Sequence, residues 1–184
     1  MQILEKTKEE IVVKAKTMSD FLKMEYFERC LVQFRDPQII KYCYAELTKL
    51  YEGRSMYTDA IRYLSKLQAL TTLAQEKYAL YEKELELIVK AGQYDRVSEV
   101  YKMAIKTTNE IQAMNLKRKI IHWYQQEAQK YEATHKSVAA LKVYERLISL
   151  LVDAEKKEAQ KKLLALYKNL GKIKESIELE KAIH

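Results

Sequence analysis

Apolar residues recur along this chain at spacings of three, four and seven residues, which is the pattern of amphipathic helices. The clearest copy starts at Gly92 and continues with Tyr94, Val97, Tyr101 and Ala104. Only 3 Gly and 1 Pro occur among the 184 residues, so the turn residues that a sheet requires are scarce. The sequence therefore predicts an all-α protein with short connections between its helices.

The same template returns at several places in the chain. A copy starts at Ser55, 37 residues before Gly92, another at His135, 43 residues after Gly92, and a further one at Gly171, 36 residues later. A fainter copy contains Phe27. Intervals of 36–43 residues lie in the range of helical-repeat proteins.

A second apolar stripe precedes each copy, so each repeat is predicted to be two helices joined by a tight turn. The stripe falls 11 and 4 positions before the first residue of each copy, at Tyr44 and Tyr51, Tyr81 and Ile88, Tyr124 and Tyr131, and Gln160 and Tyr167. Gly92 and Gly171, and Gly53 in a similar place, suit the left-handed end of a helix. Asp36 followed by Pro37 is typical of a helix start. We expect a single domain of about ten helices, in hairpins that span residues 1–35, 37–70, 72–108, 110–151 and 153–184.

These residues resemble the tetratricopeptide repeat (TPR), whose second helix carries a Gly-x-Tyr-x-x-Ala-x-x-x-Tyr-x-x-Ala pattern. The segment from Gly92 to Ala104 matches it at every position except Val97, which replaces Ala. The resemblance implies a right-handed superhelical stack of antiparallel hairpins, that is, a TPR-like α-solenoid. The repeats here are longer than the usual 34 residues and lack the terminal proline, so we expect longer first helices, notably around 110–132.

The resemblance also implies a non-catalytic scaffold or adaptor that binds a protein or peptide segment in a concave groove lined by the first helices. Mapped by register, the groove residues are Tyr42, Ala45, Lys49, Glu82, Glu86, Lys90, His122, Gln125, Gln129, Lys161, Ala165 and Lys168. The Lys and Asn of the family's clamp for chaperone C-terminal carboxylates are replaced by Glu82 and Glu86, so we do not expect that activity. A segment with basic residues toward these glutamates and acidic residues toward Lys161 and Lys168 would suit the charges.

The charge of the chain leaves a second function open. The net charge is +7, and the run Lys117-Arg118-Lys119 lies next to His122 and Trp123. A basic cluster beside an aromatic residue can attract phosphate backbones. The alternative function is therefore a basic helical-repeat protein that binds nucleic acid.

No pattern in the sequence indicates catalysis, so we expect no enzyme activity, cofactor or metal. Spacings typical of zinc ligands and of phosphate-binding loops are absent from the sequence. Cys30 and Cys43 are interpreted as small buried apolar residues. The alternating Glu82, Glu84 and Glu86 are interpreted as a solvated helix face. The charged N-terminal segment and the lack of a long apolar run predict a cytoplasmic protein without a leader or a membrane span.

The last predicted helix has an apolar face that includes Ile173, Ile177 and Ile183. Repeat arrays usually end in a polar capping helix. This helix either covers its own hairpin or buries its face in a partner, and a homo-oligomer formed through it is one prediction. The alternative that the chain is one piece of a longer array stays open.

Overall fold

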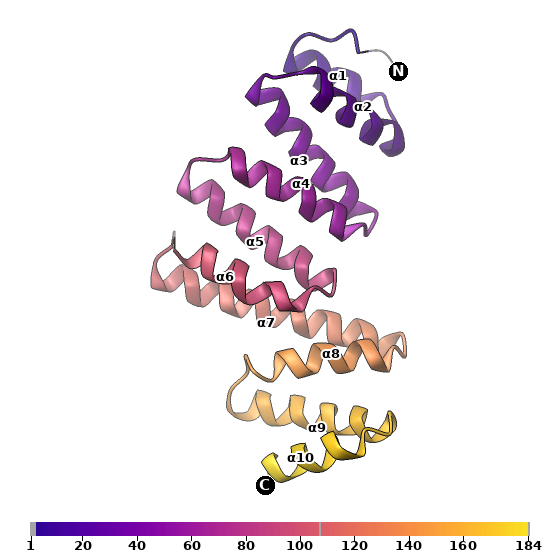
Figure 1. The fold of residues 1–184 in the computed structure, drawn as a ribbon, viewed down its shortest axis with the longest axis vertical. Helices are drawn as coiled ribbons and strands as arrows, with labels where there is room; N and C mark the ends of the chain where they lie inside the picture. The colour runs from indigo at the N-terminus through magenta and orange to yellow at the C-terminus, as the bar shows by residue number, and fades with distance from the viewer. Residues whose placement is uncertain (1–2, 107, 184) are drawn as a thin grey trace. The chain divides into compact units, whose positions relative to one another are not determined.

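A computed structural model describes residues 3–106 and 108–183 and shows two compact units, each of them entirely helical (Figure 1). The ends of the predicted first and last hairpins, residues 1–2 and 184, lie outside the described residues. Unit 1, residues 1–108, contains α1 (Lys8–Lys16), α2 (Asp20–Gln33), α3 (Pro37–Gly53), α4 (Tyr57–Leu70), α5 (Ala74–Lys90), the 3₁₀ turn η1 (Tyr94–Arg96) and α6 (Val97–Ile105). Unit 2, residues 109–184, contains α7 (Glu110–Ala133), α8 (Ser137–Leu147), α9 (Asp153–Asn169) and α10 (Ile173–Ile183). No strand occurs among the described residues, and the predicted all-α, TPR-like fold class is confirmed. The single-domain arrangement of five hairpins stays a prediction.

Within each unit, consecutive helices pack against one another in the order of the chain. In unit 1, α4 packs between α3 and α5, α6 packs on α5, and α2 lies along α3. In unit 2, α8 packs between α7 and α9, and α10 packs on α9. Each core is made of the residues at the repeating apolar positions, among them Leu47, Leu64, Leu85, Tyr124, Leu147 and Leu163.

The turns that follow α3, α5, α7 and α9 share one geometry. The first residue of each of the four clear template copies has a positive φ: 60° at Ser55, 70° at Gly92, 53° at His135 and 69° at Gly171. The residue after each donates its backbone N–H to the carbonyl five positions earlier, as Gln93 does to Ile88 at 3.0 Å. This is the Schellman ending of a helix. The prediction for Gly53 was wrong, because α3 continues through it and Ser55 takes the left-handed conformation.

The helix start predicted at Asp36 and Pro37 is confirmed. The Asp36 carboxylate accepts the N–H of Gln38 at 2.8 Å, ahead of Pro37 in the first turn of α3. Asn109 and Gln112 form a reciprocal capping box at the start of α7. Helix α7 is 24 residues long, against 17 for α3, α5 and α9, which confirms the long first helix expected around 110–132.

One tyrosine hydroxyl in each unit joins two neighbouring hairpins. Tyr51 donates to Glu28 Oε1 at 2.9 Å, and Tyr167 donates to Glu145 Oε1 at 2.9 Å. In both pairs a tyrosine four positions before the left-handed residue meets a glutamate of the preceding helix. Each phenol keeps a hydrogen bond while its ring is buried, which fixes how far one hairpin is shifted along the next.

Candidate protein-binding pocket

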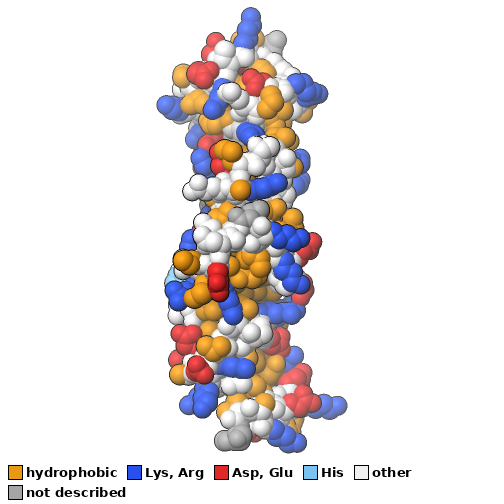
Figure 2. Space-filling model, turned by 90° about the vertical axis from the view of Figure 1, so that its left-hand side faces the viewer, with side chains coloured by type: hydrophobic (Ala, Val, Ile, Leu, Met, Phe, Trp, Pro, Cys, Tyr) orange, Lys and Arg blue, Asp and Glu red, His pale blue; other side chains and the backbone are white. Residues whose placement is uncertain are grey.

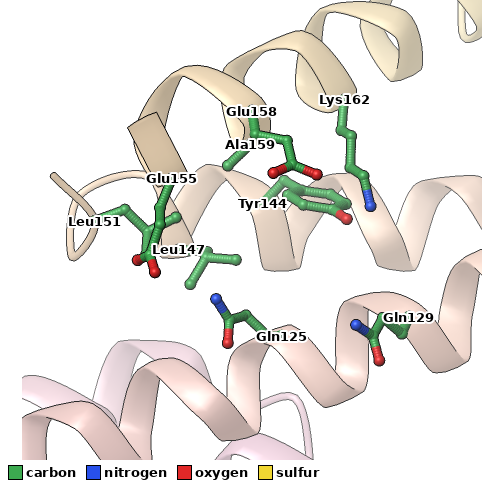
Figure 3. A pocket seen from close by; sticks show the side chains of 9 residues that line it. All are labelled: Gln125, Gln129, Tyr144, Leu147, Leu151, Glu155, Glu158, Ala159 and Lys162. Atoms are coloured by element: carbon green, nitrogen blue, oxygen red, sulfur yellow. The ribbon is translucent and has the colours of Figure 1, made fainter. Parts of the chain in front are cut away.

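Unit 2 contains a pocket of about 220 Å³ bounded by three successive helices, here named the α7–α9 pocket (Figure 3). Gln125 and Gln129 rise toward it from α7, and side chains of α9 approach it from the opposite side. The residues that line it are Gln125, Gln129, Tyr144, Leu147, Leu151, Glu155, Glu158, Ala159 and Lys162.

Apolar groups form the inner wall of the α7–α9 pocket. Tyr144 and Leu147 of α8, Leu151 of the α8–α9 connection and Ala159 of α9 are all buried. They occupy core positions of the repeat, so the core of unit 2 holds this wall in place. An apolar side chain that entered the pocket would be removed from water against a preformed surface.

Lys162 is the cation of the pocket, and it is already held by the protein. Its ammonium group donates to Glu132 Oε2 at 3.4 Å and lies 5.8 Å from the centre of the Tyr144 ring. The Tyr144 hydroxyl donates to the other oxygen of Glu132 at 2.8 Å. Although burial favours the neutral amine, Tyr144 and Glu132 together raise the pKa of Lys162 above its ordinary 10.5. Lys162 therefore carries its charge at neutral pH, and Glu132 compensates that charge.

Glu155 and Glu158 are the acidic groups of the pocket. Both are exposed, and they lie three residues apart on α9, so they project from the same side of the helix. Figure 3 shows the Glu158 carboxylate above the Tyr144 ring and the Glu155 carboxylate beside Leu147. With Lys162 compensated by Glu132, these two carboxylates give the pocket a negative charge.

The groove residues predicted for unit 2 are only partly brought together. Gln125 and Gln129 line the α7–α9 pocket, whereas Lys161 does not, and its neighbour Lys162 takes that place. His122 is exposed on α7. Lys168 pairs with Glu180 of α10 at 3.1 Å, so its charge is compensated within unit 2.

The groove residues predicted for unit 1 have partners within the protein. Tyr42 packs edge-on against Phe27, with ring centres 5.7 Å apart, and Lys8 of α1 lies over its ring. Lys49 pairs with Glu46 at 2.6 Å. Helix α1 thus lies against part of the α3 surface that the register assigned to a ligand.

The acidic patch expected on α5 is compensated by lysines. Glu86 pairs with Lys83 at 3.0 Å and with Lys90, and Lys83 also reaches Glu52 of α3 at 2.7 Å. Glu82 is half-buried and also interacts with another residue of the chain. A basic ligand segment would find little uncompensated negative charge at Glu86.

The interpretation of Glu84 as part of a solvated face was wrong. Its side chain is only 5% exposed, accepts a hydrogen bond from Gln68 of α4 at 2.8 Å and pairs with Arg96 at 3.0 Å. It occupies the repeat position held by Leu47 in α3, so it faces the core, and two polar partners make its burial tolerable. Cys30 and Cys43 are both buried free thiols, as predicted.

Lys117, Arg118 and Lys119 are exposed on α7, but they do not form one face. Consecutive residues of an α-helix point about 100° apart, so the three cations spread over more than half of the helix circumference. On the side of the molecule in Figure 2, blue cationic side chains are scattered among red and orange ones within each unit.

No group of three or more His, Cys, Asp or Glu in the described part of the chain is arranged to hold a metal ion. None of the described helices is both long and apolar enough to cross a bilayer.

Comparisons with known proteins were made at the level of sequence and of structure. No protein-family model and no curated protein matches the sequence. Among solved structures, the chain is similar to BtubC (BKLC) from P. vanneervenii, with 18% identity, a TM-score of 0.41, and coverage of 95% of this chain and 77% of that chain. It is also similar to the MamA RS-1 ArsTM double mutant, with 10% identity, a TM-score of 0.43, and coverage of 95% and 91%. A kinesin light chain protein of Podosopora anserina with nearly identical TPR-like repeats gives 14% identity, a TM-score of 0.39, and coverage of 95% and 90%.

Each of these TM-scores is below 0.5, so the repeat class rests on the helices and turns of this chain. Four pairs of helices, each closed by a Schellman turn, recur at 36–43 residues. The chain is a TPR-like helical-repeat protein.

Proposed function

We propose that the chain is a non-catalytic scaffold or adaptor that binds an extended segment of a partner protein at the α7–α9 pocket. The observation that supports this most directly is the makeup of the pocket. Two glutamine amides face a buried apolar wall across a pocket whose volume is about 220 Å³. A glutamine side chain carries both a donor and an acceptor, so it can pair with the N–H and C=O groups of a peptide backbone.

The size of the pocket also favours a polypeptide over a small metabolite. Small-molecule sites usually enclose about 300–1,000 Å³, and the α7–α9 pocket, at about 220 Å³, is smaller. One or two side chains of a peptide would fill it while the backbone runs past Gln125 and Gln129. The affinity would come from an apolar anchor with polar contacts around it.

Selection of a random linear peptide library on the full-length chain tests this function. Selected peptides should lose binding to Gln129→Trp, because Gln129 is exposed and an indole there would occupy the pocket without disturbing the core. Lys157→Trp, also at an exposed position but outside the pocket, is the matched control. If every selected peptide binds Gln129→Trp as well as it binds the parent, the proposed site is wrong. If the chain selects no peptide but binds single-stranded RNA or DNA, and charge reversal at Lys117, Arg118 and Lys119 abolishes that binding, the nucleic-acid alternative replaces it.

We also propose that α10 contacts a second copy of the chain. Ile61, Leu141 and Ile177 hold the same repeat position, six residues after the left-handed residue. Ile61 and Leu141 are each 3% exposed because the next helix packs on them, whereas Ile177 is 47% exposed. Ile173 is also largely exposed, and Ile183 is half-buried. The face of α10 therefore has the character of a stacking surface, and a second α10 of the same apolar composition would cover it.

A further inference from the structure

We infer that the partner segment presents a lysine or arginine next to an apolar residue, and that Glu155 and Glu158 receive its cationic group. This inference rests on the proposed function and specifies the partner. It reverses the charge pattern that the register suggested for the C-terminal half of the groove, where Lys161 and Lys168 were expected to attract acidic residues.

The pairing of Lys162 is the first argument. Glu158 and Lys162 are four residues apart on α9, with the glutamate on the N-terminal side, which is the favourable arrangement for an ion pair within a helix. In the described structure Lys162 instead pairs with Glu132 of α7. The Glu158 carboxylate therefore stays available to a ligand, because Lys162, the cation of the pocket, is compensated by Glu132.

The contrast with the rest of unit 2 is the second argument. Residues 109–184 contain 15 Lys and Arg against 10 Asp and Glu. Two carboxylates on one side of a pocket are thus a local exception on a basic unit. Carboxylates beside low-dielectric apolar walls attract cations more strongly than the same groups do in open water.

The arrangement of the pocket supplies the third argument. The aliphatic stem of a lysine or arginine would lie along Leu147 and Leu151, while its cationic head reaches Glu155 and Glu158. An apolar neighbour in the partner would then contact the buried wall near Ala159. A phosphate group or an acidic side chain at the same place would face both carboxylates, so nucleic acid and acidic segments are disfavoured here.

The test uses the peptides selected on the full-length chain and a matched set of variants. We expect the sequences that depend on Gln129 to be enriched in Lys or Arg beside an apolar residue. Their affinity, measured by fluorescence anisotropy, should fall about 5- to 20-fold for the double variant Glu155→Gln/Glu158→Gln, as two partly exposed ion pairs would be lost. Glu178→Gln, an exposed glutamate of α10, should bind as the parent does.

The outcomes separate this inference from the function on which it rests. Peptides that require Gln129 but lack a basic residue, or that bind the double glutamine variant unchanged, overturn the inference and leave the proposed function standing. A library that gives no Gln129-dependent peptide overturns both. All substituted side chains are exposed or half-exposed, and thermal unfolding followed by circular dichroism verifies that each variant is folded.

Discussion

The ammonium group of Lys162 lies 3.4 Å from the Glu132 carboxylate and joins α9 to α7. Counted from the left-handed residue of each hairpin, Lys162 holds position minus nine and Glu132 position minus three. Lys83 and Glu52 hold the same two positions in unit 1, and they pair at 2.7 Å. This ion pair therefore occurs in both units, where it connects two first helices, and in unit 2 it also sets the charge of the α7–α9 pocket.

Removal of the Glu132 carboxylate should destabilise the protein, and it should also leave Lys162 of the α7–α9 pocket without its ion-pair partner. Glu132→Ala leaves the buried Tyr144 hydroxyl without its acceptor, so we expect a loss of about 1–2 kcal/mol in the free energy of unfolding. Glu132→Gln keeps an acceptor and should lose only about 0.5 kcal/mol, the contribution of a partly exposed ion pair. Urea unfolding of both variants measures the difference, and equal losses would show that Tyr144 does not depend on Glu132.

At the four Schellman turns, substitutions to glycine and to alanine should change the stability of the protein in opposite directions. Ser55 and His135 have φ of 60° and 53°, a conformation that costs a side chain energy. Ser55→Gly and His135→Gly should each stabilise the chain by about 0.5–1 kcal/mol. Gly92→Ala and Gly171→Ala should destabilise it by about 1 kcal/mol.

The expected cost at Gly92 and Gly171 is conformational rather than steric. An added Cβ would meet nothing closer than the Tyr94 hydroxyl, at 4.0 Å, for Gly92, and nothing within 4 Å for Gly171. Thermal unfolding of the four single variants provides the measurement. A stabilising alanine at either glycine would contradict the assigned turn.

Acidification should weaken unit 1 through Glu86. Burial alone would raise the pKa of Glu86, but hydrogen bonds and charges from Lys90 and Lys83 hold it below the ordinary 4.5. A carboxyl whose pKa is lower in the folded than in the unfolded state contributes stability above the unfolded value, and this stability is lost as the pH falls through the folded value. The free energy of unfolding should therefore fall less steeply for Glu86→Gln than for the parent between about pH 5 and pH 3. Urea unfolding at each pH provides the measurement. If the free energy of unfolding falls equally steeply for Glu86→Gln and the parent, Glu86 is not a source of the pH dependence.

A charge at Ile177 should abolish self-association. Light scattering across a concentration series should show the parent chain as a dimer and Ile177→Lys as a monomer, because an ammonium group would be buried between two α10 helices. Val138→Lys is the matched control, since Val138 is 58% exposed on α8 and Ile177 is 47% exposed. A parent chain that is monomeric at every concentration would contradict the proposed α10 contact.

The fold was predictable because the signals that define it are local and periodic. The template position of Ser55 and His135 equals that of Gly92, so the left-handed turns follow from register even where glycine is missing. Glu84 was misinterpreted because its partners, Gln68 and Arg96, come from other segments of the chain. The register did carry a sign of burial, because Glu84 lies three residues after Tyr81 and four before Ile88, on the apolar stripe of α5.

The pocket was only half predictable, for a geometric reason. The register assumes that each first helix presents the same side to a ligand. The α7–α9 pocket lies between two such helices, so the edge of α7 that bears Gln125 and Gln129 faces the opposite edge of α9. On that edge the residue is Lys162, and a shift of one residue turns a side chain by about 100° away from Lys161. The recurring Lys and Glu at positions minus nine and minus three are a signal that could have pointed to Lys162.

Binding at the α7–α9 pocket is tested most directly by nuclear magnetic resonance. The isotope-labelled full-length chain is titrated with the tightest library peptide, and the amide signals of backbone and side chains are followed. We predict that the side-chain amide signals of Gln125 and Gln129 shift together with the backbone signals of Leu147 and Leu151. Shifts confined to unit 1 or to residues 117–119, with both glutamine signals unchanged, would contradict the proposed site.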